Sequence, residues 1–238
     1  MTSSPMLSIS STDRIFILCG AGVSAESGIP TFRGVAGLWR NYRIEEVASP
    51  YAWQRDPRLV WEFYSMRRKV ASAAQPNPAH FALAKLEQGL GERLFLCTQN
   101  VDNLHEQAGS RRVIHMHGEL FKSRCDTCHR PPFDDSHLYE PPAKIPRCPC
   151  GGQIRPHICW FGEVPFGLNQ IYAALDECTI FMAIGTSGVV EPAASFVASV
   201  RGRARTIYVG PEHPANAASF TECHLGNAGE VLPRLFGP

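Results

Sequence analysis

Four of the nine cysteines in this 238-residue chain fall into two close pairs, a pattern typical of a metal site. Two residues separate Cys125 from Cys128, and one residue separates Cys148 from Cys150. Two pairs of thiolates can enclose a zinc ion tetrahedrally, and a site closed by four protein ligands has no open position for catalysis. The pattern therefore predicts a structural zinc ion, with free thiols or a redox pair as the alternative.

A glycine-rich string, Gly20-Ala21-Gly22-Val23-Ser24-Ala25, directly follows a short apolar run. It fits the G-x-G-x-x-G/A pattern of a strand-to-helix turn, where backbone N–H groups approach the pyrophosphate of a dinucleotide. A glycine-rich turn without a ligand is the alternative. An ordinary dehydrogenase would also carry an acidic residue about 20 positions later, at the end of a second strand. Glu45 and Glu46 stand at that distance in a helical segment, which argues against a dehydrogenase.

Two polar strings follow other apolar runs. The first, Thr98-Gln99-Asn100-Val101-Asp102-Asn103-Leu104-His105, places an amide and a carboxylate close together, where they could hold a carboxamide group. Polar side chains at the carboxyl ends of parallel strands lie where open α/β sheets bind ligands, although turn and cap chemistry is the alternative. The second is His117-Gly118, in which His117 is a candidate general base. Position alone makes His115 equally suitable.

Tyr64 and Arg67 are three residues apart in a predicted helix, so they share one face of it. A phenol and a guanidinium side by side can bind a carboxylate through charge-assisted hydrogen bonds. The alternative is a solvated arginine beside a half-buried tyrosine.

Short apolar runs that alternate with helical patterns must position these side chains. The runs are Ile15–Cys19, Leu94–Cys97, Val113–Met116, Ile180–Ile184 and Ile207–Val209. Helices are predicted to begin at Asp56-Pro57 and Asn77-Pro78, and to include Asn169–Glu177 and Pro192–Val200. Continuous apolar strands are typical of a parallel sheet covered on both sides. The predicted fold class is therefore α/β, a Rossmann-like parallel sheet with helices on both faces.

Two regions interrupt the alternation. Residues 35–76 are helical and rich in aromatic side chains, without a strand signal, and residues 119–157 contain the paired cysteines. We expect these helical and zinc-binding insertions to form a small lobe. The large Rossmann-like domain would then comprise residues 12–34, 77–118 and 158–238, within one catalytic unit over residues 1–238.

The composition excludes several classes of protein. Lys+Arg 23 against Asp+Glu 22 gives a net charge of +1, which argues against a basic protein specific for nucleic acid. No apolar run reaches the ~18 residues of a membrane span, and the first residues lack the features of a secretory signal. Nine cysteines, an odd number, argue against a disulfide framework. The compact chain is expected to be cytoplasmic, and a monomer is the default expectation because the sequence carries no signal of oligomeric state.

Taken together, the strings resemble the sirtuin family of NAD-dependent protein lysine deacylases, in the family's order from about Arg14 to Leu235. The segment 20–33 is similar to the family's cofactor loop, and 98–105 to its nicotinamide-ribose motif. His117-Gly118, the four cysteines, Trp160-Phe161-Gly162-Glu163 and Gly185-Thr186-Ser187 complete the series. The segment Trp61–Arg67 resembles the class III branch, in which a Tyr-x-x-Arg pair reads succinyl and malonyl groups.

The sequence departs from the family's pattern at three places. Its second cysteine pair is tighter than the commoner C-x2-C, and Val101 replaces the more common Ile. Gly210-Pro211-Glu212 stands where many relatives carry an Asn near the adenosine ribose, so that contact has no assigned residue.

The resemblance implies that NAD is a co-substrate, that the four cysteines bind one structural zinc, and that His117 takes a proton from a ribose hydroxyl. The cofactor-binding residues that it implies are Gly20, Ala21, Gly22, Ser24, Ala25, Phe32, Arg33, Gln99, Asn100, Asp102, Gly185, Thr186, Ser187 and Ala228.

The resemblance also implies that an acyl-lysine peptide binds as an extended strand between Gly162-Glu163 and Val189-Val190. Trp160 and Phe161 would line the lysine tunnel, with Tyr64 and Arg67 at its far end. The products would be free lysine, nicotinamide and O-acyl-ADP-ribose. Three alternatives remain open: an ADP-ribosyltransferase that uses the same pocket, a deacetylase without acidic-acyl preference, and a non-enzymatic binding module.

Overall fold

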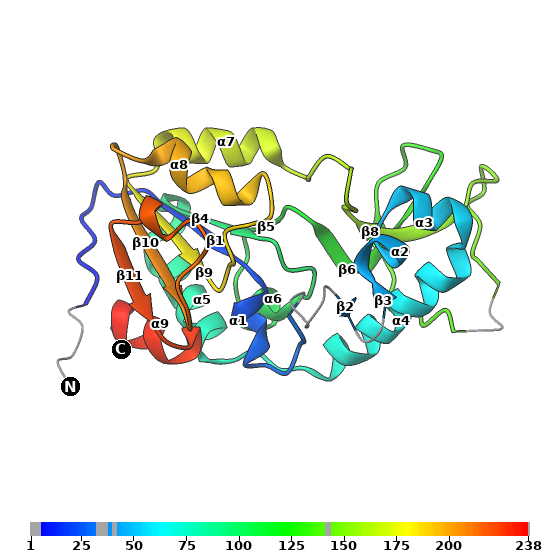
Figure 1. The fold of residues 1–238 in the computed structure, drawn as a ribbon, viewed down its shortest axis with the longest axis horizontal. Coiled ribbons are helices and arrows are strands. Elements are labelled where there is room, and N and C mark those ends of the chain that lie inside the picture. The colour runs from blue at the N-terminus through cyan, green and yellow to red at the C-terminus, as the bar shows by residue number, and fades with distance from the viewer. Residues whose placement is uncertain (1–5, 32–37, 40–41, 141–143, 238) are drawn as a thin grey trace.

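The computed structural model describes residues 6–31, 38–39, 42–140 and 144–237 (Figure 1). The strands of the main sheet are β1 (Ile15–Cys19), β4 (Leu94–Thr98), β5 (Val113–His115), β9 (Ile180–Ile184), β10 (Arg205–Gly210) and β11 (Glu222–Leu225). Its helices are α1 (Ala21–Ala25), α5 (Pro78–Leu90), α6 (Leu104–Gln107), α7 (Leu168–Glu177), α8 (Phe196–Val200) and α9 (Ala228–Phe236).

The main sheet is parallel throughout, with the spatial order β11-β10-β9-β1-β4-β5. This is the strand order of a Rossmann fold, in which the direction of winding reverses between two central strands. Here the reversal falls between β1 and β9, where Ile15 pairs with Ile180. The predicted fold class is confirmed.

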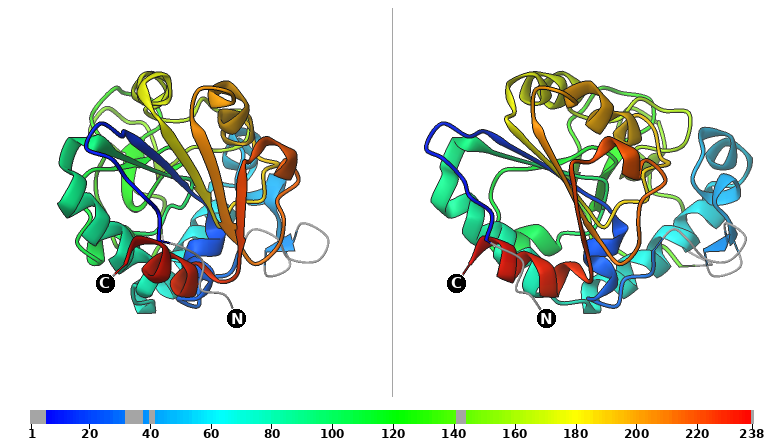
Figure 2. Two further views of the ribbon diagram at one scale, coloured as in Figure 1. Left: turned by 90° about the vertical axis from the view of Figure 1, so that its left-hand side faces the viewer. Right: turned by 60° about the vertical axis from the view of Figure 1, so that its left-hand side comes forward.

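Both faces of the sheet are buried, as the continuous apolar strands predict. In β1, Ile15 and Ile17 pack in the cluster that contains residues of α5 and α9. Phe16 and Leu18 alternate with them and pack in the cluster that contains residues of α7 and α8. Figures 1 and 2 show these helix pairs on opposite sides of the sheet. Burying each such side chain stabilises the fold by about 1.5–3 kcal/mol.

A second group of elements lies beyond the end of the main sheet, and we call it the small lobe (Figure 1). It contains α2 (Ile44–Val47), α3 (Pro50–Arg55), α4 (Pro57–Ala73), and the antiparallel sheet of β6 (Gly118–Cys125), β7 (Phe133–Asp134) and β8 (Ile154–Ile158). Aromatic side chains, including Trp53, Trp61 and Trp160, fill its core. The helices α4 and α5 begin at the predicted caps, Asp56 and Asn77.

Two strand assignments differ from the sequence prediction. The region expected to lack strands contains a short antiparallel pair, β2 (Leu38–Trp39) and β3 (Tyr42–Arg43), whose strands are too short for a periodic pattern to reveal. The edge strand β11 has the sequence Glu-Cys-His-Leu and is only partly buried, so it produces no apolar run. Among the described residues, no helix combines the length and apolar character needed to cross a membrane.

Candidate active site

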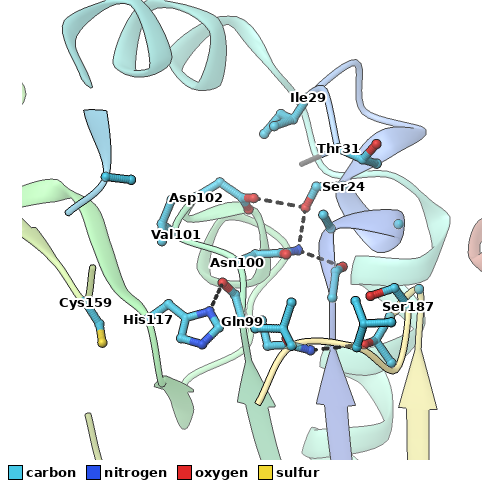
Figure 3. A pocket seen from close by; sticks show the side chains of 18 of the residues that line it. Ser24, Ile29, Thr31, Gln99, Asn100, Val101, Asp102, His117, Cys159 and Ser187 are labelled. Atoms are coloured by element: carbon cyan, nitrogen blue, oxygen red, sulfur yellow. Dashed lines mark hydrogen bonds between the residues drawn. The ribbon is translucent and has the colours of Figure 1, made fainter. Parts of the chain in front are cut away.

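A cavity of about 490 Å³ lies where the carboxyl ends of the main strands meet the small lobe (Figure 3). The loops after β1, β4, β9 and β10 line one part of it, and residues of α4 and of the segment after β8 line another. Parallel strands all end at the same edge of a sheet, so chain segments far apart in sequence meet here.

Two glycines of the loop after β1 make the close packing of this edge possible. A Cβ atom on Gly20 would lie 2.7 Å from the carbonyl oxygen of Gly185, and one on Gly22 would lie 2.7 Å from its Cα atom. Gly185 itself follows β9 with a φ of +60°, a conformation that favours glycine. These glycines are therefore required by the contact between the loops after β1 and β9, at the point where the sheet's winding reverses.

A buried polar network joins the loops after β1 and β4. The Asn100 amide donates to the Gly20 carbonyl oxygen (3.1 Å) and to Ser24 Oγ (3.0 Å), and Ser24 Oγ donates to Asp102 Oδ2 (3.0 Å). Both N–H donors of Asn100 are thereby used, so its side chain can offer a ligand only its carbonyl oxygen. Burial raises the pKa of Asp102, against hydrogen bonds from Leu104 and Ser24 that lower it.

His117 follows β5 and lines the cavity. Its Nδ1 atom lies 3.1 Å from the backbone oxygen of Gln99. Because a carbonyl oxygen can only accept, Nδ1 carries the proton in this contact and Nε2 is the basic atom of the ring. Burial lowers the pKa of His117, opposed by the Gln99 contact, so the ring is neutral near pH 7.

The structure separates the two histidines that position alone could not distinguish. His115 Nε2 forms a 2.7 Å ion pair with Glu106 of α6, and its Nδ1 lies 3.1 Å from the Asn100 carbonyl oxygen. Burial opposes its protonation, but the hydrogen bond and charge of Glu106 prevail and raise the pKa of His115. His115 thus supports the loop after β4, whereas His117 faces the cavity.

Tyr64 and Arg67 both line the cavity and are buried, with 1% and 8% of their surfaces exposed. The alternative of a solvated arginine is therefore excluded. Burial lowers the pKa of Arg67, and interactions with Tyr64 and Asp102 oppose the shift. Burial likewise raises the pKa of Tyr64, so that its hydroxyl stays protonated near neutral pH.

The Trp-Phe-Gly-Glu segment after β8 lines the cavity with side chains of contrasting exposure. Trp160 is buried, whereas Phe161 is 54% exposed, and Val189, another lining residue, is 58% exposed. The Glu163 carboxylate turns to Arg155, with Oε1 2.6 Å from Nη1. Gly162 completes this part of the cavity lining.

The four paired cysteines converge in the small lobe, with all their Sγ atoms within 4.8 Å of one another. The Sγ atoms of Cys125 and Cys150 are 3.5 Å apart, and those of Cys128 and Cys148 are 3.7 Å apart. Disulfides require about 2.05 Å, whereas sulfurs around a tetrahedral zinc with Zn–S of about 2.3 Å are about 3.8 Å apart. The tight second pair therefore still fits one zinc ion.

The cofactor residues implied by the resemblance are mostly brought together. The cavity lining includes Gly20, Ala21, Gly22, Ser24, Gln99, Asn100, Asp102, Gly185, Thr186 and Ser187. Ala25 is exposed at the end of α1 and Ala228 is buried at the start of α9, and neither is among the described lining residues. Phe32 and Arg33 lie outside the described residues.

The structure adds lining residues that sequence reasoning did not assign. They are Ile29, Pro30, Thr31, Ala48, Val101, Ile158, Cys159, Pro165, Glu191, Tyr208, and residues 211–214. The position of residues 211–214 directly after a parallel strand could have revealed that group. Tyr208 is an exception, because it lies within β10 and its hydroxyl donates to the Thr186 carbonyl oxygen over 3.2 Å.

Comparison with known proteins agrees with this geometry. The Sir2 family model matches residues 20–192. An NAD-dependent protein deacylase of Vibrio cholerae serotype O1 is 49% identical over 230 residues, which cover 93% of this chain and 91% of that protein. An NAD-dependent protein deacylase of Caulobacter vibrioides is 50% identical over 224 residues, covering 92% and 94%.

Solved structures show the same relationship. A complex of a Sir2 homologue with NAD matches with a TM-score of 0.87 at 42% identity, covering 95% of this chain and 89% of that one. A Sir2 variant with a deacetylated p53 peptide and 3′-O-acetyl ADP-ribose matches with a TM-score of 0.81 at 29% identity, covering 93% and 91%. The chain therefore belongs to the Sir2 family.

Proposed function

We propose that this protein is an NAD-dependent protein lysine deacylase. The observation that carries the proposal is the shared cavity of a neutral His117, the loop after β1, and the buried Tyr64 and Arg67. The names of its relatives from Vibrio cholerae and Caulobacter vibrioides support the same reaction.

The loops after β1, β4 and β9 would hold NAD. Their fit is supported by the close approach of Gly20 and Gly22 to Gly185, which leaves backbone rather than side chains at this edge. Asn100 and Asp102 would hold the nicotinamide carboxamide, and Gln99 the adjoining ribose. When bound, NAD supplies the ribose carbon that receives the acyl oxygen as nicotinamide leaves.

His117 would act as general base. Its Nδ1–H is held by the Gln99 carbonyl oxygen at 3.1 Å, so Nε2 is the atom that can take a proton from a ribose hydroxyl. The cavity would also position the acyl-lysine oxygen, which matters because an amide oxygen is a weak nucleophile in water. With one water molecule consumed to release the lysine amine, the products would be free lysine, nicotinamide and O-acyl-ADP-ribose.

The peptide would bind as an extended strand between Gly162-Glu163 and Val189-Val190. Phe161 and Val189 line the cavity and have exposed side chains, which supports this placement. Main-chain hydrogen bonds dominate such binding and tolerate many sequences.

We further propose a preference for succinyl and malonyl groups over acetyl. A carboxylate on the acyl group would meet the guanidinium of Arg67 and the hydroxyl of Tyr64, both withdrawn from solvent. Hydrogen bonds to charged groups contribute about 1.5–3 kcal/mol. An acetyl group offers no such partner, so this part of the binding energy would be lost.

Product analysis tests the reaction. The purified protein is incubated with acetyl-, malonyl- and succinyl-lysine peptides, with and without NAD, and the products are identified by mass spectrometry. We expect deacylated peptide, nicotinamide and O-acyl-ADP-ribose only when NAD is present. ADP-ribose attached to protein, without release of free lysine, would instead indicate an ADP-ribosyltransferase.

A further inference from the structure

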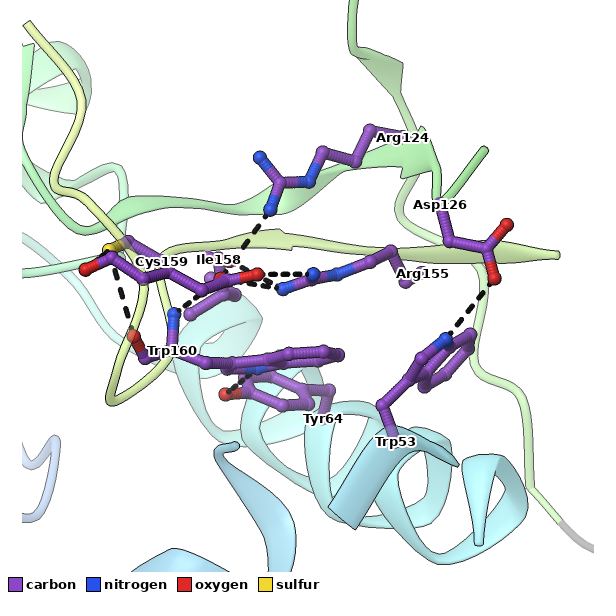
Figure 4. A network of polar contacts seen from close by, with 9 residues as sticks. Trp53, Tyr64, Arg124, Asp126, Arg155, Ile158, Cys159 and Trp160 are labelled. Carbon is purple, nitrogen blue, oxygen red and sulfur yellow. Dashed lines mark hydrogen bonds and ion pairs between the residues drawn. The ribbon is translucent and has the colours of Figure 1, made fainter. Parts of the chain in front are cut away.

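The side chains of Arg155 and Trp53 clamp Trp160, and neither of them is among the described residues that line the cavity (Figure 4). The guanidinium carbon of Arg155 lies 3.3 Å from the centre of the Trp160 ring, and the ring of Trp53 lies 5.8 Å away, tilted by 41°. Stacking of a guanidinium on an indole combines a cation–π attraction with close packing. Arg155 thereby restricts the tilt of the indole plane.

Glu163 holds Arg155 in this position. Its carboxylate receives two hydrogen bonds from the guanidinium, of 2.6 Å and 3.0 Å, and it also accepts the backbone N–H of Trp160 at 2.8 Å. Arg155 donates further to the Ile158 carbonyl oxygen at 3.0 Å. A bidentate arginine–carboxylate pair has a defined geometry. Arg155 therefore fixes the ring of Trp160, while Glu163 fixes its backbone N–H.

The indole connects this clamp to the helix that carries Tyr64 and Arg67. Trp160 Nε1 donates to the Tyr64 hydroxyl oxygen at 3.0 Å, a contact between residues 96 positions apart. Arg67 also interacts with Tyr64 by hydrogen bonding. A phenol oxygen that accepts N–H donors keeps its own O–H proton for donation to another group. The Tyr64 hydroxyl is therefore set up as a hydrogen-bond donor.

We propose that Arg155 is a positioning residue for acyl-group selectivity: with Glu163 it holds Trp160, whose indole N–H keeps the Tyr64 hydroxyl directed at the carboxylate of an acidic acyl group. The inference rests on the acidic-acyl preference proposed above. Arg155 is not among the described residues that line the cavity, so it would act through Trp160 and Tyr64.

The proposal predicts an asymmetric loss in Arg155→Met. Removing the guanidinium frees the indole to tilt and weakens its bond to Tyr64, and only an acidic acyl group uses that hydroxyl. We expect the KM for a succinyl-lysine peptide to rise about tenfold, with kcat changed by less than about threefold, since one hydrogen bond changes affinity by roughly two- to tenfold and stacking adds to it. The KM for the acetyl-lysine peptide should rise by less than about threefold.

Arg124→Met is the matched control. Arg124 Nη2 also reaches the Glu163 carboxylate, at 3.5 Å, but its guanidinium lies against Phe166 and not against Trp160. This variant removes a second cation from the same carboxylate while leaving the Arg155 clamp intact. Both KM values should stay within about twofold of the wild type. If Arg124→Met matched the selectivity loss of Arg155→Met, general electrostatics would explain the result and the proposal would fail.

Two further variants keep the test decisive if Arg155→Met folds poorly. Arg155→Lys retains the charge without the planar stack and should show an intermediate loss of selectivity, at a melting temperature close to the wild type. Trp160→Phe keeps an apolar wall but lacks the N–H, so it should lose most of the succinyl preference. Adding Arg155→Met to Trp160→Phe should change the succinyl-to-acetyl ratio little further. Additive losses in the double variant would overturn the proposed linkage.

Arg67→Met, measured in parallel, distinguishes failure of the acidic-acyl preference from failure of the positioning role of Arg155. A selective succinyl loss in Arg67→Met together with equal losses on both substrates in Arg155→Met would leave the acidic-acyl preference standing and reject the positioning role. Equal losses in Arg67→Met as well would reject the preference and, with it, this inference.

Discussion

At the scale of single residues, the surroundings of a side chain decide its chemistry. His115 and His117 are two positions apart, yet one forms an ion pair with Glu106 and the other contacts only a backbone carbonyl among its described hydrogen bonds. The pKa of His115 is raised and that of His117 is lowered. The surroundings therefore favour the protonated form of His115 and the neutral, basic form of His117.

The first prediction concerns the pH dependence of deacylation. His117 must be unprotonated to act as a base, and burial places its pKa below the usual 6.5. In a plot of kcat/KM against pH, the midpoint of the acidic limb should therefore lie below pH 6.5. Activity should rise with pH through this limb as His117 loses its proton, and it should no longer change with pH near pH 7. Measurement from about pH 5 to about pH 9 checks this.

His117→Ala is the control for this assignment. Loss of a general base should lower kcat by roughly 10²–10⁴-fold while NAD binding, followed by calorimetry, is retained. NAD-dependent activity at the wild-type level in His117→Ala would show that another group is the base.

The second prediction concerns Arg67. Replacing it in Arg67→Met removes the buried cation that would pair with an acidic acyl group, so the KM for succinyl-lysine peptide should rise by about 10- to 100-fold, equivalent to about 1.5–3 kcal/mol. Deacetylation should fall much less. Steady-state kinetics on both peptides provide the measurement, and equal losses would make Arg67 a structural residue.

At the scale of elements, helix α4 places two adjacent residues in different surroundings, one in the cavity lining and one in the core of the small lobe. Successive residues on a helix point about 100° apart, so Arg67 lines the cavity while Arg68 enters the core of the small lobe. Arg68 Nε donates to the Leu120 carbonyl oxygen at 2.8 Å, and its guanidinium pairs with Asp135 at 3.3 Å. The orientation of the helix face that carries Tyr64 and Arg67 is thus supported by a buried ion pair on the next residue, Arg68.

The third prediction follows from that pair. The side chains of Arg68 and Asp135 are 1% and 7% exposed, so Arg68→Met leaves a buried carboxylate without its cation. The free energy of unfolding should fall by about 3–5 kcal/mol, measured by urea denaturation. The double variant Arg68→Met/Asp135→Asn should recover part of this loss, because it removes the unpaired charge. No recovery would show that packing, and not charge, dominates at this position.

At the scale of the whole molecule, the active site is assembled between two separately packed bodies. The main sheet contributes the loops around His117, and the small lobe contributes Tyr64, Arg67 and Trp160. The cysteine cluster lies within the small lobe and has no open ligand position once four thiolates bind a metal. Zinc would therefore act on the site only by holding the lobe's shape.

The fourth prediction tests this role of zinc. Metal analysis of the purified protein should find one equivalent of zinc, and Cys148→Ser should lower both the zinc content and the melting temperature. Chelation should reduce deacylation in step with loss of the lobe's structure, followed by circular dichroism, since structural zinc contributes to folding. A folded, fully active protein without zinc would refute the four-thiolate site.

Much of the fold can be predicted from the sequence, because apolar runs and helix caps depend only on neighbouring residues. The apolar strands β1, β4 and β9 and the Asn77 and Asp56 caps depend on neighbouring residues, and the structure confirms them. The strand β11 escaped prediction because it pairs only with β10 at the edge of the sheet and needs no apolar face. The strands of the β2–β3 pair are too short for an alternating pattern of apolar residues to appear.

The sequence by itself determined which chemical groups are present and which strand or helix carries each, because motif spacing and hydrophobic period are properties of neighbouring residues. Tertiary structure alone decided which histidine faces the cavity, why Gly20 must approach Gly185, and that Trp160 bonds Tyr64 from 96 positions away. Those outcomes depend on burial and on contacts between distant segments. Such contacts form only when the chain packs, and no local pattern encodes their geometry.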